Sequence, residues 1–363
     1  MTLPTSCSPK LPNQCSFNSH KTFLLSFSSF QFPVSKSEFG LIMDRWSGVL
    51  KIPLDATSVN YYRVAASLCL SSSSSKALVA PCANAIFFHG DMVRETGNHV
   101  IERLYDLQKV AEIIVSKFGN SVNAWVVEAS LYNGPFAIYK DFVPSVNRFG
   151  EPKAYSPFGF PASSSIVSLL SSFLHEAGKE VSLVNQLASG HNCPRTIALG
   201  FSKGGVVINQ LLSEMSSLST DSAETSSSTT QEEHRSKRED VQMIPASKES
   251  FLSSISQVHY IDVGLNSRGA YITDKNVVQR ISQRLAGGEE AVRVVLHGTP
   301  RQWCDEQRGW ILEEKDELVR LIKSEAESSG GRLEVHERLY FADRLADLQM
   351  HFEIIDVMDV SST

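Results

Sequence analysis

Cysteine is sparse in this sequence, and the motifs of metal and nucleotide sites are missing. No C-x-x-C pair occurs among the six cysteines, which favours reduced thiols in an intracellular protein over a disulfide framework. There is no H-E-x-x-H motif and no carboxylate-rich loop, so no metal site is expected. The absence of G-x-G-x-x-G and P-loop motifs argues against a nucleotide-binding fold. We therefore expect no cofactor.

The sequence also lacks a long basic run and a long apolar run. Its formal net charge is −6, which argues against nucleic acid as the main partner. No apolar stretch approaches the length of a membrane span. These absences favour a soluble intracellular globular protein.

Acidic residues are missing from the start of the chain. Residues 1–37 contain no Asp or Glu, many serines, and three lysines as their only Lys or Arg. An acid-free, Ser-rich start resembles an organellar transit peptide, although arginine is absent. We interpret residues 1–42 as a disordered leader or a transit peptide to the mitochondrion, with the chloroplast as the alternative. If translation begins at Met43 instead, the location is the cytoplasm.

Strand-like and helix-like segments alternate along the rest of the chain. Apolar runs predict strands at 48–54, 61–70, 84–91, 123–130, 195–200, 257–265, 291–300 and 332–341. Apolar residues at helical spacing predict helices at 100–118, 163–178, 204–215, 276–285 and 310–327. Such alternation requires crossover connections and indicates a doubly wound α/β fold whose mostly parallel sheet has about eight strands. We assign residues 43–363 to this single domain.

One internal segment does not fit the alternation. Residues 216–250 are dominated by Ser, Thr, Glu and Lys and contain very few large apolar side chains. Such a segment cannot bury enough surface to offset the entropy lost on ordering. We predict a disordered insertion within the domain.

The motif Gly-Phe-Ser-Lys-Gly-Gly at 200–205 lies between a predicted strand and a predicted helix. In α/β-hydrolases a G-x-S-x-G turn in this context exposes a nucleophilic serine, here Ser202. The backbone N–H of Lys203 would then point at a developing oxyanion, helped by the helix dipole. A second donor is expected after the third strand, from Gly90 or Asp91. We interpret the neighbouring His89 as structural.

A base and an acid should follow the serine in the order Ser, Asp or Glu, His. His351 follows the last predicted strand and opens a helix, so it is the preferred base, with His297 as the weaker alternative. For the acid we favour Asp305, in the loop after the penultimate strand. Asp262, on the preceding strand, is the alternative.

The connection over residues 131–162 is too long and too aromatic for a simple loop. Two interpretations stay open. It could cover the serine as a lid whose aromatic side chains face an apolar substrate, or these side chains could anchor the loop to the sheet. The aromatic residues concerned are Phe142, Phe149, Tyr155 and Phe158.

Four segments together resemble the chromosome 2 open reading frame 69 family. They are "AIFFHGD", "GFSKGG", "TPRQWCDEQRGW" and "MHFEI", in this order, and the resemblance spans roughly residues 84–355 without the serine-rich insertion. It implies an α/β-hydrolase-like fold, a serine-hydrolase-like site on Ser202, Asp305 and His351, and a link to mitochondria. It implies no particular substrate.

These observations support two functional hypotheses. The first is a serine hydrolase that uses a Ser-His-Asp triad on a small-molecule or lipid-like carboxylic ester or thioester, without a cofactor. The second is a catalytically silent α/β-hydrolase fold that acts as a binding or regulatory protein, because a fold does not dictate a function.

Overall fold

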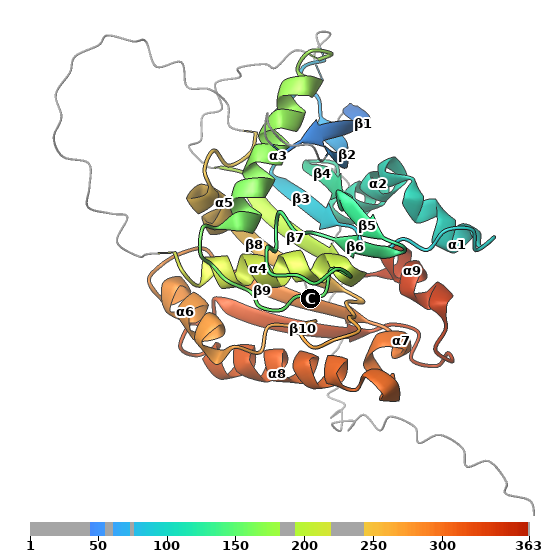
Figure 1. Cartoon of the computed structure of the whole chain (residues 1–363). Coiled ribbons are helices and arrows are strands. Elements are labelled where there is room, and N and C mark those ends of the chain that lie inside the picture. Colours follow the sequence, from blue (N-terminus) through green and yellow to red (C-terminus); the bar gives the residue numbers. More distant parts are fainter. Residues whose placement is uncertain (1–43, 55–60, 73–75, 182–192, 219–242, 362–363) are drawn as a thin grey trace, which may run out of the picture. The chain divides into compact units, whose positions relative to one another are not determined.

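The computed structural model describes residues 44–54, 61–72, 76–181, 193–218 and 243–361 (Figure 1). The predicted leader, residues 1–42, lies outside the described residues, as do residues 219–242 of the predicted insertion. The structure therefore does not test the predicted leader, and it tests the predicted insertion only at residues 216–218 and 243–250.

An eight-stranded sheet forms the centre of the described domain. Its spatial order is β1-β2-β4-β3-β7-β8-β9-β10, in which the first three strands pair antiparallel and the remaining pairs are parallel. This is the strand order of an α/β-hydrolase fold, so the predicted fold class is confirmed. The strands are β1 (Arg45–Pro53), β2 (Tyr61–Cys69), β3 (Ala83–Phe88), β4 (Val122–Val127), β7 (Arg195–Phe201), β8 (Ile255–Ile261), β9 (Val292–Gly298) and β10 (Leu333–Leu339).

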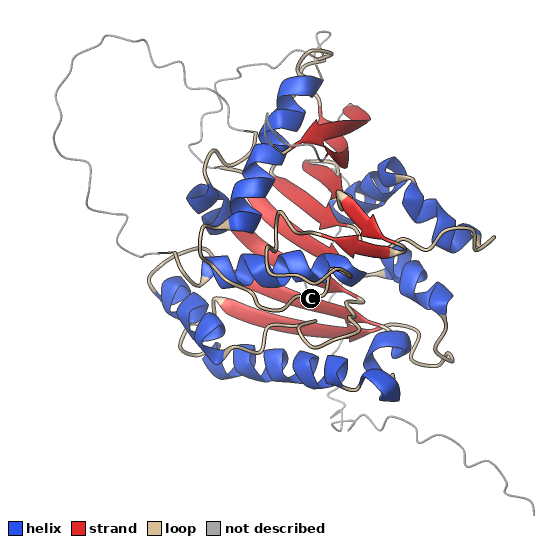
Figure 2. Ribbon diagram, in the orientation of Figure 1, coloured by secondary structure: helices blue, strands red, loops and turns tan. Residues whose placement is uncertain are grey.

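Helices cover both faces of this sheet (Figure 2). The longer ones are α2 (Leu107–Phe118), α3 (Pro161–Ala177), α4 (Gly205–Met215), α6 (Lys275–Ala286), α8 (Trp310–Glu325) and α9 (Leu348–Val357). The shorter ones are α1 (His99–Glu102), α5 (Lys248–Ser254), α7 (Pro300–Trp303) and the 3-10 turns η1 (Arg103–Tyr105), η2 (Ser202–Gly204) and η3 (Glu306–Arg308). The side chains of α2 and α9 belong to one apolar cluster, and those of α3, α4, α6 and α8 to the other.

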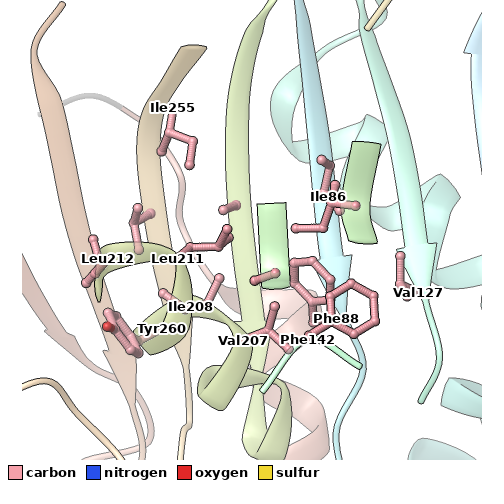
Figure 3. Close-up of a cluster of buried hydrophobic side chains, with 14 of the residues drawn as sticks. Ile86, Phe88, Val127, Phe142, Val207, Ile208, Leu211, Leu212, Ile255 and Tyr260 are labelled. Atoms are coloured by element: carbon pink, nitrogen blue, oxygen red, sulfur yellow. The ribbon is translucent and has the colours of Figure 1, made fainter. Parts of the chain in front are cut away.

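Alternation along the central strands explains the two clusters. In β3, Ile86 and Phe88 join the cluster under α4, whereas Phe87 joins the cluster under α2 and α9. Successive side chains of a strand point to opposite faces, so a strand buried on both faces is apolar throughout. Figure 3 shows apolar side chains of α4, among them Val207 and Ile208, in the same cluster as Phe88 of β3.

Two local features of the ordered elements differ from the sequence prediction. The predicted helix at 100–118 is interrupted, because the Asp106 carboxylate caps α2 by accepting from the Lys109 N–H at 3.2 Å. A small hairpin of β5 (Leu131–Asn133) and β6 (Phe136–Ile138) follows β4 and was not predicted.

The predicted insertion also extends too far toward the C-terminus. Met243 and Ile244 are buried in the core, and the Asn84 side chain donates to the Met243 carbonyl at 3.0 Å. Helix α5 begins at Lys248, inside the interval 216–250. Composition alone missed this packing because only a few of these residues carry the apolar contacts.

Candidate active site

Ser202 lies at the sharp turn between β7 and α4. Its φ is +51°, in the left-handed region that residues other than glycine seldom adopt. Such strain is retained where the surroundings determine the backbone, and it clusters at functional sites. The serine is buried, with 5% of its surface exposed.

The glycines of the motif are required by close packing at this turn. A Cβ on Gly204 would lie 2.1 Å from the Phe88 carbonyl oxygen, and one on Gly200 would lie 2.6 Å from the Ile208 side chain. At Gly205 it would lie 2.5 Å from Val263. A side chain at Gly204 or Gly205 would push the turn away from β3 or from the residues after β8, and one at Gly200 would push α4 away from β7.

His351 is bonded to Asp262 and not to Asp305. The His351 Nδ1 atom lies 2.6 Å from Asp262 Oδ2. The Asp262 carboxylate is fully buried and also accepts from the Thr299 N–H at 2.8 Å and the Thr299 hydroxyl at 3.1 Å. These contacts fix the carboxylate against the imidazole at the carboxyl end of β8.

The preference for Asp305 as the acid is therefore corrected. The Asp305 carboxylate caps η3 by accepting from the Gln307 N–H at 2.9 Å, and it accepts from Arg308 Nε at 2.8 Å. Burial acts to raise the pKa of Asp305, but the hydrogen bonds from Arg308 and Gln307 outweigh it and lower the pKa. Helix α7 separates this residue from the end of β9, whereas Asp262 directly follows β8, the neighbour of β7.

The imidazole of His351 lies against the turn that carries the serine. Its ring stacks on Phe201, the residue before Ser202, with ring centroids 4.7 Å apart. The structure thus brings Ser202, His351 and the alternative acid Asp262 to one end of the sheet.

The loop after β3 runs directly beside Ser202. A Cβ on Gly90 would lie 2.5 Å from the Ser202 Cβ and 2.9 Å from the Phe201 carbonyl oxygen. The predicted donors Gly90 and Asp91 are therefore neighbours of the serine. The loop is attached to the β5–β6 hairpin, because Met92 N–H donates to the Pro135 carbonyl at 2.8 Å.

The two other candidate histidines are engaged in structural contacts. His89 is buried; its Nε2 lies 3.0 Å from the Leu104 carbonyl, and burial lowers its pKa. His297 is fully buried, with Nε2 3.0 Å from His259 Nδ1 and Nδ1 2.9 Å from the Tyr340 hydroxyl. None of these hydrogen bonds is to the serine turn. This agrees with the structural interpretation of His89 and with His297 as the weaker candidate for the base.

The aromatic residues of 131–162 divide between the two interpretations of that segment. Phe142 is fully buried in the core, and the Tyr155 hydroxyl donates to the Gly269 carbonyl at 2.6 Å, so both anchor the segment. Phe149 is half-buried and packs edge-on against Phe136 at 5.5 Å. Phe158 is 92% exposed. The anchoring interpretation fits Phe142 and Tyr155.

A cavity of about 460 Å³ lies between the loop after β3 and the β5–β6 hairpin. It is lined mainly by apolar groups, with one arginine: Met92, Val93, Arg94, Tyr132, Gly134 and Pro135. Within the described ranges, no group of three or more His, Cys, Asp or Glu could hold a metal ion. No described helix is both long and apolar enough to cross a membrane.

The motif predicts a role for Lys203 only through its backbone, but its side chain is fully buried beside the serine turn. Its ammonium forms an ion pair with the buried Glu151 carboxylate and donates to the Phe149 carbonyl at 3.2 Å. Asp91 Oδ2 lies 4.0 Å from the same nitrogen. The motif did not predict this burial, because a lysine at the same position of the motif could equally be exposed to solvent.

Comparison with solved structures returns esterases and related hydrolases at very low identity. A putative carboxylesterase from Lactobacillus plantarum WCFS1 is 9% identical with a TM-score of 0.37, covering 82% of this chain and 87% of that one. An S-formylglutathione hydrolase from Agrobacterium tumefaciens is 12% identical with a TM-score of 0.39, covering 88% and 94%. At these TM-scores the likeness carries no information on activity.

Comparison with known sequences returns one family. The family model described as C2orf69 matches residues 192–326. The mitochondrial protein C2orf69 homolog of Danio rerio is 25% identical over 289 residues, covering 75% of this chain and 72% of that protein. The human mitochondrial protein C2orf69 is 24% identical over 328 residues, covering 76% and 74%. These matches confirm that the chain resembles the C2orf69 family.

Proposed function

We propose that the protein is a serine hydrolase that cleaves a carboxylic ester or thioester. The observation that carries the proposal is the bond between His351 and a buried aspartate, Asp262, beside a strained serine between strand and helix. The order Ser202, Asp262, His351 along the chain is the order of an α/β-hydrolase triad.

In the proposed reaction, the Ser202 hydroxyl attacks the carbonyl carbon and passes its proton to His351. The bond to Asp262 uses Nδ1, so Nε2 is the nitrogen that accepts this proton. The tetrahedral intermediate collapses when the leaving alcohol or thiol takes the proton from Nε2, and an acyl-enzyme forms. Water then attacks the acyl group and gives a proton to His351, the bond between the acyl carbon and Ser202 Oγ breaks, and the serine oxygen takes that proton as the carboxylic acid leaves. Asp262 holds the imidazole tautomer and stabilises the imidazolium.

The backbone N–H groups of Lys203 and of Gly90 or Asp91 serve as the oxyanion donors. The close approach of Gly90 to Ser202 supports this assignment. It places the loop after β3 where its N–H groups can reach the oxygen of the substrate carbonyl that Ser202 attacks. The apolar cavity of Met92, Tyr132 and Pro135, whose Met92 follows Gly90 and Asp91 in the same loop, is where we place an apolar part of the substrate.

We also propose a mitochondrial location. The relatives from Danio rerio, Mus musculus and Homo sapiens are named mitochondrial proteins. The acid-free composition of residues 1–37 supports the same assignment. A fluorescent protein fused behind residues 1–42 should accumulate in mitochondria, and diffuse cytosolic fluorescence would contradict this location.

The activity is tested by hydrolysis of p-nitrophenyl esters of graded acyl length by the full chain. Ser202→Ala should lower kcat by on the order of 10⁶-fold on any ester that is turned over. The matched control is Ser213→Ala, which changes another buried serine on α4 and should leave kcat unchanged. Equal rates for the wild type and Ser202→Ala would reject the hydrolase proposal in favour of the silent binding protein.

A further inference from the structure

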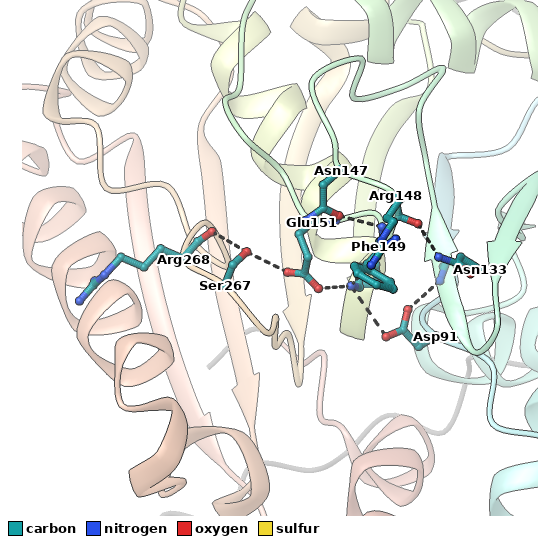
Figure 4. A network of polar contacts seen from close by, with 10 residues as sticks. Asp91, Asn133, Asn147, Arg148, Phe149, Glu151, Ser267 and Arg268 are labelled. Carbon is teal, nitrogen blue, oxygen red and sulfur yellow. Dashed lines mark hydrogen bonds and ion pairs between the residues drawn. The ribbon is translucent and has the colours of Figure 1, made fainter.

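The ammonium of Lys203 has contacts from three separate segments of the chain. Glu151 pairs with it from the segment before α3, and the Phe149 carbonyl accepts from it at 3.2 Å. Asp91 Oδ2 approaches to 4.0 Å from the loop after β3, and the Phe136 ring lies 5.3 Å away on β6. Figure 4 shows Asp91, Phe149 and Glu151 converging on this point.

Stability alone does not explain this arrangement. Both members of the Lys203–Glu151 pair are buried, with 1% and 4% of their surfaces exposed. A buried ion pair gains little net stability, because the attraction must first offset the loss of hydration of both charges. Well-packed apolar side chains of similar volume are often equally stable or better.

The network connects the two places in the chain that carry the proposed oxyanion donors. Lys203 carries one donor N–H, and Asp91 belongs to the loop that carries the other. The turn at Ser202 is fixed by η2 and α4, whereas residues 89–94 belong to no helix or strand. The position of that loop therefore depends on its side-chain contacts. One of them is the hydrogen bond that the Asp91 carboxylate accepts from the Ala137 N–H at 2.8 Å.

The segment that carries Phe149 and Glu151 is also held by close contacts. A Cβ on Gly150 would lie 2.1 Å from the Ala137 carbonyl oxygen, so the chain at 149–151 packs directly on β6. Glu151 Oε2 also accepts from the Ser267 hydroxyl at 3.0 Å. The ammonium therefore joins the serine turn to β6 and to the loop after β3 at one point.

We propose that the Lys203 side chain is a positioning residue that sets the spacing of the two oxyanion donors. The proposal rests on the hydrolase function proposed above. Oxyanion donors act only when they are held at hydrogen-bond distance from the transition-state oxygen, and a shift of a fraction of an ångström weakens them. The Lys203 side chain acts through Asp91 and Glu151, and only the backbone N–H of this residue faces the substrate.

The test replaces both charges together, because a single removal would leave the partner buried without a counter-charge. In the full chain, Lys203→Met with Glu151→Met should keep the Tm within a few degrees of the wild type. Its kcat on a p-nitrophenyl ester should fall by on the order of 10-fold to 10²-fold, with KM nearly unchanged. The affinity for a trifluoromethyl ketone, which forms a tetrahedral adduct on serine, should fall by a similar factor.

The control is the double change Lys315→Met with Glu337→Met, which removes the ion pair that another buried lysine, Lys315 on α8, makes with the more exposed Glu337 on β10. It should leave kcat and the ketone affinity unchanged. If the Lys203 double variant folds and keeps wild-type kcat and ketone affinity, the positioning role is overturned while the hydrolase function stands.

Two further outcomes are separated by the same experiment. If the Lys203 double variant does not fold, Glu151→Gln gives the decision: a lower kcat at unchanged KM supports the proposal, and an unchanged kcat overturns it. If the wild type neither hydrolyses esters nor binds the ketone, the hydrolase function itself fails, and the positioning role fails with it.

Discussion

His351 Nδ1 and Asp262 Oδ2 lie 2.6 Å apart although 89 positions separate the two residues in the chain. The contact joins the start of α9 to the carboxyl end of β8, and both sites flank the turn that carries Ser202. Strands β7 and β8 are neighbours in the sheet, so a residue at the end of β8 is delivered to the serine without a long loop.

This contact predicts which aspartate matters. Asp262→Asn should lower kcat by about 10⁴-fold, because the amide holds the imidazole in the wrong tautomer. Asp305→Asn should change kcat by less than about threefold, since that carboxylate caps η3 and bonds Arg308. Steady-state kinetics of the two variants decide between them. A large loss for Asp305→Asn with a small one for Asp262→Asn would reverse the assignment.

Gly90 should tolerate no side chain. The Cβ in Gly90→Ala would lie 2.5 Å from the Ser202 Cβ and 2.9 Å from a backbone oxygen, so the loop must shift. We expect a loss of about 1–3 kcal/mol in the free energy of unfolding, together with a lower kcat. Gly309→Ala is the control, because its Cβ would meet no atom within 4 Å. Denaturant melts that show no difference between the two variants would contradict the close approach.

The predicted insertion should be replaceable only in part. A short Gly/Ser linker in place of residues 219–242 should leave the Tm unchanged, because their composition offers little apolar surface to bury. Extending the replacement through residue 250 removes the buried Met243 and Ile244. That longer replacement should cost several kcal/mol, at about 1.5–3 kcal/mol for each buried apolar side chain. Equal melting temperatures for the two replacements would contradict this boundary.

Two buried histidines should make the protein sensitive to mild acid. Burial lowers the pKa of His297 from 6.5 to about 3. The pKa of His259 is lowered well below 6.5, mainly by burial and to a smaller extent by the neighbouring His297. The native state therefore keeps both rings neutral, while the unfolded chain binds protons below pH 6.5. The stabilisation is complete above pH 6.5 and is lost as the pH falls toward 3.

The expected slope is up to about 1.4 kcal/mol per pH unit for each of these histidines. His297→Gln should reduce the slope of the unfolding free energy between pH 6.5 and 5 by up to that amount, measured by urea denaturation. Between pH 7.5 and 8.5 the wild type and the variant should show the same slope. An unchanged slope below pH 6.5 would mean that His297 is protonated in the native state.

Much of the fold followed from local patterns in the sequence. Apolar runs located the strands of the sheet, and the Gly-x-Ser-x-Gly motif located the turn between strand and helix that carries Ser202. The β5–β6 hairpin was not predicted, because three-residue strands leave too short a pattern to recognise. Helix α5 was missed because it carries only two buried apolar residues, Phe251 and Leu252, within a polar stretch.

The site was less predictable than the fold. The base could be ranked by its place after the last strand, but the choice between Asp262 and Asp305 depends on which loop turns toward His351. That choice is a long-range contact, and neither residue's neighbours in the sequence encode it. The burial of Lys203 depends in the same way on Glu151, which lies 52 positions earlier in the chain.

The central claim, that Ser202 is an activated nucleophile, is tested most directly by labelling with a fluorophosphonate. The full wild-type chain should form a covalent adduct that peptide mapping locates on Ser202. His351→Ala should slow the labelling by several orders of magnitude while the protein stays folded, because the hydroxyl then has no base. If the folded wild type is not labelled at Ser202, or is labelled as fast without His351, the claim is contradicted.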